Sequence, residues 1–161
     1  MSTIQNSGGY LTYPNLPVFH VDATGSSGSG GQDLTLTTTA AEITSFFNSV
    51  RVNRGNHFNT STGRFTAPTS GIYEFYMYFI TGNANDVYRF AFYKNGTDIG
   101  KQLRLDTSDT TNTDYETGSI KIYEELAAGD YVSIYGWSDA GNNAYVNPIG
   151  NYSFFTGRLI G

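Results

Sequence analysis

Short apolar runs alternate along this chain with clusters of glycine, asparagine, aspartate and proline. From Val18 onward the runs have the length of strands, about 4–8 residues, and turn-forming residues separate one run from the next. Regular spacing of this kind is typical of a β-sandwich or a β-barrel. The pattern therefore predicts an all-β fold.

The run at residues 72–80 is the clearest predicted strand, and it is apolar on both faces. Side chains alternate across a strand, so each face occupies every second position. The odd face carries Tyr73, Phe75, Met77 and Phe79, and the even face carries Glu74, Tyr76, Tyr78 and Ile80. An outer strand of a monomeric sandwich normally shows water a polar face. This strand therefore predicts a second burial surface on its even face.

Further strands are predicted at residues 87–93, 117–123, 131–137 and 152–160. The first of them runs into Asn95-Gly96, a strong hairpin signal because both residues tolerate positive φ. A helix is conceivable only within residues 34–47, where the sequence AAEITSFF occurs. A run of threonines and the lack of capping residues favour strand and loop there instead.

Composition narrows the class of protein. The chain has 161 residues, of which 39% are hydrophobic and 16% aromatic, and this suits one domain with a ring-rich core. Only 14% of the residues are charged and the net charge is −5, so nucleic-acid binding through a basic surface is not expected. We expect no membrane insertion and no secretory signal, because no apolar run is long enough for either. The absence of cysteine excludes disulfides and thiolate metal sites.

The predicted strands carry short motifs in a fixed order. They read PVFHV at 17–21, FFNSV at 46–50, NHF at 56–58, GRFTAP at 63–68, GIYEF at 71–75, YKNG at 93–96, LAAGDYV at 126–132 and FFTGRLI at 154–160. In this order and spacing the motifs resemble the globular head of complement component C1q and its wider superfamily, which includes the tumour-necrosis-factor ligands. The resemblance covers residues 17–161.

This resemblance implies a ten-stranded jelly-roll sandwich that assembles as a homotrimer. The strand with two apolar faces supports the same assembly independently, because tyrosine is favoured in interfaces between proteins. We therefore expect Tyr76, Tyr78 and Ile80 to lie in the trimer interface.

Glycines in the motifs predict sharp turns. Gly63 and Gly71 are expected where the chain must turn with positive φ, which glycine adopts at little steric cost. The Gly129-Asp130 pair is expected to form the turn before the strand at 131–137, because aspartate bonds to nearby backbone in turns.

Residues 1–16 are polar and rich in glycine, serine and asparagine. Proline disfavours helix in the residue before it, so Pro14 and Pro17 favour an extended attachment arm, followed by the head at residues 17–161. A chain with no cysteine, few lysines and many threonines, asparagines and tyrosines is similar in composition to bacteriophage fibre and capsid-decorating proteins. The analogy predicts a virion location, with residues 1–16 bound to a capsid or tail protein. The alternative is an extracellular or cell-surface location.

Catalysis is not expected, and neither is an organic cofactor. His20 and His57 lie on predicted strands or turns, and the common nucleophile, phosphate-loop and zinc-protease motifs are missing. Acidic residues cluster at 106–116, and Ca²⁺ takes six to eight oxygen ligands. Some members of the C1q superfamily hold calcium near the trimer apex, so Asp109 and Asp114 are the candidate calcium ligands. The alternative is that these aspartates only form turns.

Binding by polar loops is the remaining function, and the candidate loops are residues 82–86, 107–114 and 138–147. Tyr115, Trp137 and Tyr145 lie in or beside them, and rings next to Asn and Asp usually line sugar sites; the alternative is that these rings cover the barrel ends. The sequence predicts a non-enzymatic trimeric module, a virion fibre, tip or capsid-decorating protein that presents a knob to a host-surface glycan or protein. The alternative is a secreted or spore-surface lectin of the same fold.

Overall fold

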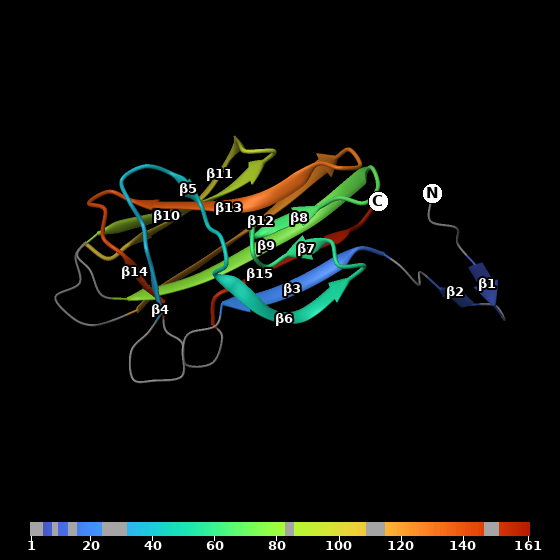
Figure 1. The fold of residues 1–161 in the computed structure, drawn as a ribbon, viewed down its shortest axis with the longest axis horizontal. Helices are drawn as coiled ribbons and strands as arrows, with labels where there is room; N and C mark the ends of the chain where they lie inside the picture. Colours follow the sequence, from blue (N-terminus) through green and yellow to red (C-terminus); the bar gives the residue numbers. More distant parts are fainter. Residues whose placement is uncertain are drawn as a thin grey trace.

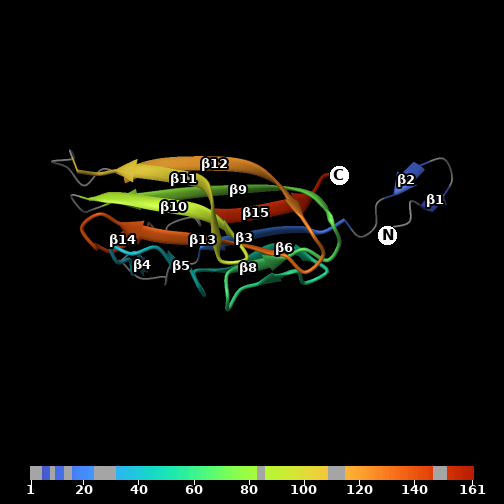
Figure 2. The same ribbon diagram turned by 90° about the horizontal axis from the view of Figure 1, so that it is seen from above.

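Two antiparallel sheets face each other and enclose the apolar side chains of the core (Figures 1 and 2). The structure is a computed structural model, and it describes residues 5–7, 10–12, 16–23, 32–82, 86–108, 115–146 and 152–161. Within these residues the chain forms strands and no helix. The prediction of an all-β sandwich is confirmed.

The larger sheet has seven strands, with the predicted two-faced strand near its centre. Its strands are β3 (Val18–Ala23), β4 (Gln32–Leu34), β6 (Phe47–Arg54), β9 (Gly71–Gly82), β12 (Tyr115–Leu126), β14 (Ala144–Val146) and β15 (Phe154–Leu159). β9 pairs with β12 and with β15, and the sheet continues from β15 to β3 and β6. The short β14 pairs with the end of β9 and with β4.

The smaller sheet has six strands and covers the opposite side of the core. Its strands are β5 (Ala41–Glu42), β7 (Phe58–Asn59), β8 (Arg64–Thr66), β10 (Val87–Lys94), β11 (Thr97–Asp106) and β13 (Tyr131–Ser138). The order is β11, β10, β13, β8 and β7, with β5 also paired to β13. A second run of five strands, in the larger sheet, has the order β6, β3, β15, β9 and β12. The two runs together supply the ten strands of the predicted jelly roll, and β4, β5 and β14 are additional.

Two short strands lie in the N-terminal segment, β1 (Gln5–Ser7) and β2 (Tyr10–Thr12), and they pair antiparallel with each other. Figure 1 shows this pair beside the sandwich and outside both sheets. The backbone is extended within each strand, but the two strands run in opposite directions. That residues 1–16 serve as an extended attachment arm stays a prediction.

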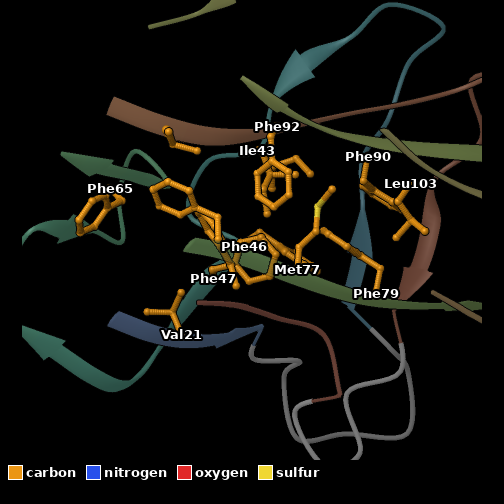
Figure 3. Close-up of a cluster of buried hydrophobic side chains, with 14 of the residues drawn as sticks. Val21, Ile43, Phe46, Phe47, Phe65, Met77, Phe79, Phe90, Phe92 and Leu103 are labelled. Carbon is orange, nitrogen blue, oxygen red and sulfur yellow. The ribbon is translucent and has the colours of Figure 1, made fainter. Parts of the chain in front are cut away.

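β9 has one buried face and one partly exposed face, as its alternation predicts. The odd positions from 73 to 79 are fully buried, whereas the even positions from 74 to 80 are partly exposed. Figure 3 shows Met77 and Phe79 of β9 in the buried cluster together with Phe90 and Phe92 of β10. The rings of Phe79 and Phe90 stack with centroids 3.8 Å apart, so the two sheets are joined by direct ring contact. Each favourable ring pair contributes about 0.5–1.5 kcal/mol to stability beyond the contribution from burying the rings.

Phe19 is at the centre of a second group of rings in the same core. It stacks on Phe58 and Phe65, at 4.8 and 5.0 Å between centroids, and meets the edge of Phe155 at 4.8 Å. These rings come from β3, β7, β8 and β15, which belong to both sheets. Aromatic side chains from both sheets therefore fill the space between them.

The hairpin between β10 and β11 is confirmed. Asn95 and Gly96 have φ values of 51° and 77°, the pair of positive values that a tight two-residue hairpin turn requires. The turn before β13 is also confirmed, because the Asp130 carboxylate accepts a hydrogen bond from the backbone N–H of Ala127 at 2.9 Å. Local side-chain chemistry therefore predicts both turns correctly.

The two glycines with predicted positive φ differ. Gly63 has φ +71°, as predicted, whereas Gly71 is not in the positive-φ region. A Cβ atom at Gly71 would lie 2.5 Å from the carbonyl oxygen of Gly161. Close approach of the last residue, and not a turn, is therefore the reason that position 71 needs glycine.

Residues 34–47 form strand and loop, as predicted. β5 pairs with β13 in the middle of the segment, and β6 starts at its end. The side chains of Leu36, Ile43 and Phe46 are buried against the core. The apolar residues of the candidate helix are therefore buried against the core from loop positions between short strands.

Candidate functional site

A cluster of partly exposed rings, which we call the aromatic face, lies on the outward side of the larger sheet. It consists of His20 on β3, Tyr76 and Tyr78 on β9, and Phe154 on β15. Phe154 is central: its ring stacks on His20 with centroids 5.0 Å apart and on Tyr78 at 5.7 Å, and it lies 5.4 Å from Tyr76. Strand register produces this arrangement, because Phe154 lies opposite Tyr78 in the sheet.

Exposed apolar side chains extend the aromatic face across the sheet. Val52 on β6 is opposite His20, and 41% of its surface is exposed. Tyr123 on β12 is opposite Glu74, and 61% of its surface is exposed. Exposed apolar surface that continues over several strands is a mark of an interaction site.

The structure brings the predicted residues Tyr76 and Tyr78 together on this face. Ile80 lies on the same side of β9 and is partly buried against the core. Phe154 was not predicted, although the FF pair at 154–155 carried the signal. Neighbouring residues of a strand point to opposite faces, and Phe155 is indeed fully buried.

Charged groups sit at two places beside the aromatic face. The Glu74 carboxylate forms two ion pairs, with Nε of Arg158 at 3.1 Å and with Nζ of Lys121 at 3.4 Å. Burial opposes ionisation of Glu74, but these two cations outweigh it and hold the pKa of the carboxyl below its ordinary value. The buried carboxylate of Asp22 bonds to Nε2 of His20 at 3.1 Å and to the Arg51 guanidinium. The His20 ring is thereby held in place against Phe154.

Asp86 connects the loops at one end of the sandwich. Its buried carboxylate accepts hydrogen bonds from the backbone N–H groups of Val87, Ala140 and Asn142 at 2.6, 3.0 and 3.2 Å. Its backbone carbonyl accepts from both the N–H and the hydroxyl of Thr107, each at 2.9 Å. Burial alone would raise the pKa of this carboxyl, but the N–H donors lower it below its ordinary value. Asp86 thus ties the start of β10 to the loop after β13 through its carboxylate and to the loop after β11 through its backbone carbonyl.

The three aromatic residues of the predicted binding loops are divided between the two sheets. Tyr115 on β12 and Tyr145 on β14 are both opposite Gly82 at the end of β9. Trp137 belongs to β13 in the smaller sheet and is opposite Arg89 on β10. The structure therefore groups Tyr115 with Tyr145 by backbone position and separates Trp137 from them.

The candidate calcium ligands Asp109 and Asp114 lie outside the described residues. The start of their loop shows turn chemistry: Asp106 accepts hydrogen bonds from the N–H and the hydroxyl of Ser108 and pairs with Arg104 at 2.7 Å. Bonds from Ser108 and Arg104 hold the pKa of Asp106 below its ordinary value. In the described part of the chain, no three His, Asp or Glu side chains are grouped so that they would hold a metal ion.

The two histidines occupy structural positions. His20 belongs to the aromatic face, and the His57 ring meets the edge of Phe65 at 6.5 Å between centroids. The described ranges contain no helix that is long and apolar enough to cross a membrane.

Comparison with known proteins identifies the family. A family model described as the C1q domain matches residues 31–160. Mouse complement C1q tumor necrosis factor-related protein 3 is 32% identical over 115 residues, which are 71% of this chain and 43% of that protein. Human complement C1q tumor necrosis factor-related protein 2 is 31% identical over 114 residues, 71% of this chain and 38% of that protein. The chain therefore belongs to the C1q domain family.

Solved structures agree on the fold. The globular domain of zebrafish complement 1qA protein matches with a TM-score of 0.61 and 19% identity, over 91% of this chain and 98% of that chain. Murine APRIL at pH 8.0 matches with a TM-score of 0.60 and 13% identity, over 91% of this chain and 100% of that chain. At these identities the likeness concerns the jelly-roll fold alone.

The relatives also bear on function. This chain spans about two fifths of the length of the curated relatives that it matches. Proteins related to C1q and tumour necrosis factor are not enzymes, and the prediction that the chain is not an enzyme is confirmed. The relatives come from mouse and human, and the comparisons do not show the virion context that composition predicts.

Proposed function

We propose that the chain is a non-enzymatic binding module that assembles as a homotrimer through the aromatic face of its larger sheet. The observation that carries this proposal is the row of stacked, partly exposed rings formed by His20, Phe154, Tyr78 and Tyr76. A large aromatic side chain buries about 150–250 Å² when it is fully covered. Three copies that cover this face jointly would remove the exposed ring surface from water.

The charges beside this face fit an interface. Glu74 is paired with Arg158 and Lys121, and Asp22 is paired with Arg51 and His20. An unpaired charge is costly to bury, whereas a paired and hydrogen-bonded charge costs less. Covering this face in a trimer would therefore bury few uncompensated charges.

Recognition would use surfaces that the trimer leaves open. The loops joined by Asp86 lie at one end of the sandwich, and loops held on a rigid scaffold commonly carry binding residues. The proposed partner is a glycan or a protein that is carried on another surface. The head would present its loops to that surface as an outward knob. Calcium binding by Asp109 and Asp114 stays a prediction from the sequence.

The location we propose is extracellular or on a particle surface, with residues 1–16 as the attachment segment. The virion role, through a capsid or tail protein, rests on composition alone and gains no support from the mouse and human relatives. The small hairpin of β1 and β2 favours a tether shorter than a fully extended segment. A two-stranded hairpin is only marginally stable alone, so contact with a partner would stabilise it.

Deletion of residues 1–16 tests whether the head forms trimers without the attachment segment. Because the aromatic face lies wholly within residues 17–161, the shortened chain is expected to form trimers as the full chain does. Size-exclusion chromatography with light scattering would measure the mass of both. A shortened chain that elutes as single copies, while the full chain forms trimers, would contradict the placement of the interface in the head.

A further inference from the structure

The smaller sheet also carries aromatic side chains on its outward side. We call them the tyrosine stripe: Tyr93 on β10, and Tyr131, Tyr135 and Trp137 on β13, all partly exposed. Val132 and Ile134 of β13 are buried in the core, so the odd positions lie on the outward side, where Ser133 between Tyr131 and Tyr135 is itself covered. The stripe therefore lies on the outward side of the smaller sheet, whereas the aromatic face lies on the outward side of the larger sheet.

The rings of the stripe are held in a fixed arrangement. Tyr93 and Tyr135 stack with centroids 3.7 Å apart and 12° between their planes. The guanidinium of Arg64 lies 4.2 Å above the ring of Tyr131 and makes two bonds to Glu42, at 2.8 and 2.7 Å. A bidentate pair of this kind fixes the plane of the guanidinium. A ligand would meet rings that are already in position, which reduces the entropy lost on binding.

The arginines around the stripe are paired with carboxylates. Arg64 is paired with Glu42, Arg89 with Asp139, and Arg104 with Asp106. Asp98, exposed on β11 opposite Tyr93, adds a negative charge beside the stripe, so an anionic ligand is disfavoured.

The hydroxyl groups of Tyr93 and Tyr135 stay neutral. Burial raises the pKa of Tyr93 and of Tyr135 above the ordinary value, with Asp98 adding to the effect at Tyr93 and Glu42 at Tyr135. Both hydroxyls are consequently hydrogen-bond donors and acceptors throughout the physiological pH range. The stripe combines ring surface, neutral hydroxyls and paired charges.

We propose that the tyrosine stripe binds a neutral polysaccharide, with pyranose rings lying against Tyr93, Tyr135 and Trp137. A pyranose presents C–H groups on one face, which match the electron-rich face of an aromatic ring, and hydroxyls at its edge. Several rings on one face of the sheet suit a chain of sugars better than a single sugar, because successive sugars can each contact an aromatic side chain. A protein partner is the less favoured occupant, since protein interfaces gain specificity from complementary charges that this surface has already paired internally.

Assembly would strengthen the binding. In the proposed trimer the stripe faces outward on each copy, so one polysaccharide could engage several copies and avidity would exceed the affinity of one stripe. This gain rests on the proposed function, whereas the stripe itself is complete within one chain.

Affinity electrophoresis tests the proposal on the full chain. Native gels are cast with a soluble mannan, a galactan or a β-glucan, and a further gel contains dextran sulfate as an anionic comparison. The wild-type protein is expected to be retarded in at least one neutral gel. Tyr135→Ala and Trp137→Ala are each expected to weaken the apparent affinity at least tenfold.

Two variants serve as controls. Tyr135→Phe keeps the ring and is expected to stay within threefold of wild type. Tyr152→Ala removes an exposed ring outside the stripe and is expected to bind as wild type does. Thermal melting and sedimentation of each variant show whether it folds and assembles. If Tyr135→Ala does not fold, Trp137→Ala and Tyr135→Phe still decide the question.

The proposal is overturned by no retardation in any neutral gel, by retardation in dextran sulfate only, or by unchanged retardation of both alanine variants. The first of these results would leave a protein partner as the occupant of the stripe. Failure of the trimer is distinguishable: the wild type would sediment as single chains, and any retardation, although weaker, would still depend on Tyr135 and Trp137.

Discussion

Tyr78→Asp is expected to convert the protein from trimers to single chains. Tyr78 stacks on Phe154 in the middle of the aromatic face, and an aspartate there would place a negative charge where three copies exclude water. A buried charge without a partner costs several kcal/mol, and each chain of the trimer would carry one. Sedimentation velocity at a fixed protein concentration measures the change, and the predicted shift is from three chain masses to one.

Two variants control for the added charge and for the lost ring. Gln102→Asp adds the same charge on an exposed position of β11 in the smaller sheet, and we expect it to stay trimeric. Tyr78→Phe keeps the ring and should also stay trimeric. If Tyr78→Asp sediments exactly like wild type, or if Gln102→Asp dissociates as well, the larger sheet is not the interface.

Asp86→Ala is expected to lower the free energy of unfolding by about 3 kcal/mol. The substitution leaves the N–H groups of Val87, Ala140 and Asn142 without their acceptor inside the protein, and hydrogen bonds to a charged group contribute about 1.5–3 kcal/mol each. Some of this loss would be recovered by water that enters the loops. In a chain of this size the melting temperature should fall by roughly 6–12 °C. Calorimetry at a fixed protein concentration is the measurement.

The matched control is Asp98→Ala, which removes an exposed carboxylate that accepts a hydrogen bond from the backbone N–H of Gly100 at 2.7 Å. A surface change of this kind should alter stability by less than about 1 kcal/mol. Equal melting temperatures for Asp86→Ala and wild type would show that the loops do not depend on this carboxylate.

The same carboxylate predicts a dependence on pH. The folded pKa of Asp86 lies below its ordinary value of 3.8, so its stabilising contribution is present above that pH and is lost as the pH falls through the folded pKa. The difference in stability between wild type and Asp86→Ala should therefore be constant near neutral pH and shrink in acid below about pH 4. A difference that grows in acid would contradict this assignment.

Local patterns predicted the fold because strand period and turn chemistry are properties of neighbouring residues. The alternation along residues 72–80 identified both faces of β9, and Asn95-Gly96 identified the hairpin that follows β10. The tyrosines of the proposed interface came from the same alternation. These features need no knowledge of which strands lie side by side.

Contacts between distant segments could not be predicted in this way. Asp86 bonds to Ala140 and Asn142, which are 54 and 56 residues further along the chain, and nothing local marks that pairing. Phe154 joins the aromatic face only because β15 pairs with β9 in one particular register. Gly71 was assigned to a turn because its true constraint, the carbonyl of Gly161, is at the other end of the chain.

Sedimentation equilibrium of the unmodified full chain, over a range of protein concentrations, tests the central claim most directly. The account predicts a single species of three times the 17.6 kDa chain mass, because the stacked rings of the larger sheet are covered by neighbouring copies. A soluble, folded species of one chain mass at all of these concentrations would show that the aromatic face is stable in water, and would contradict the proposed assembly.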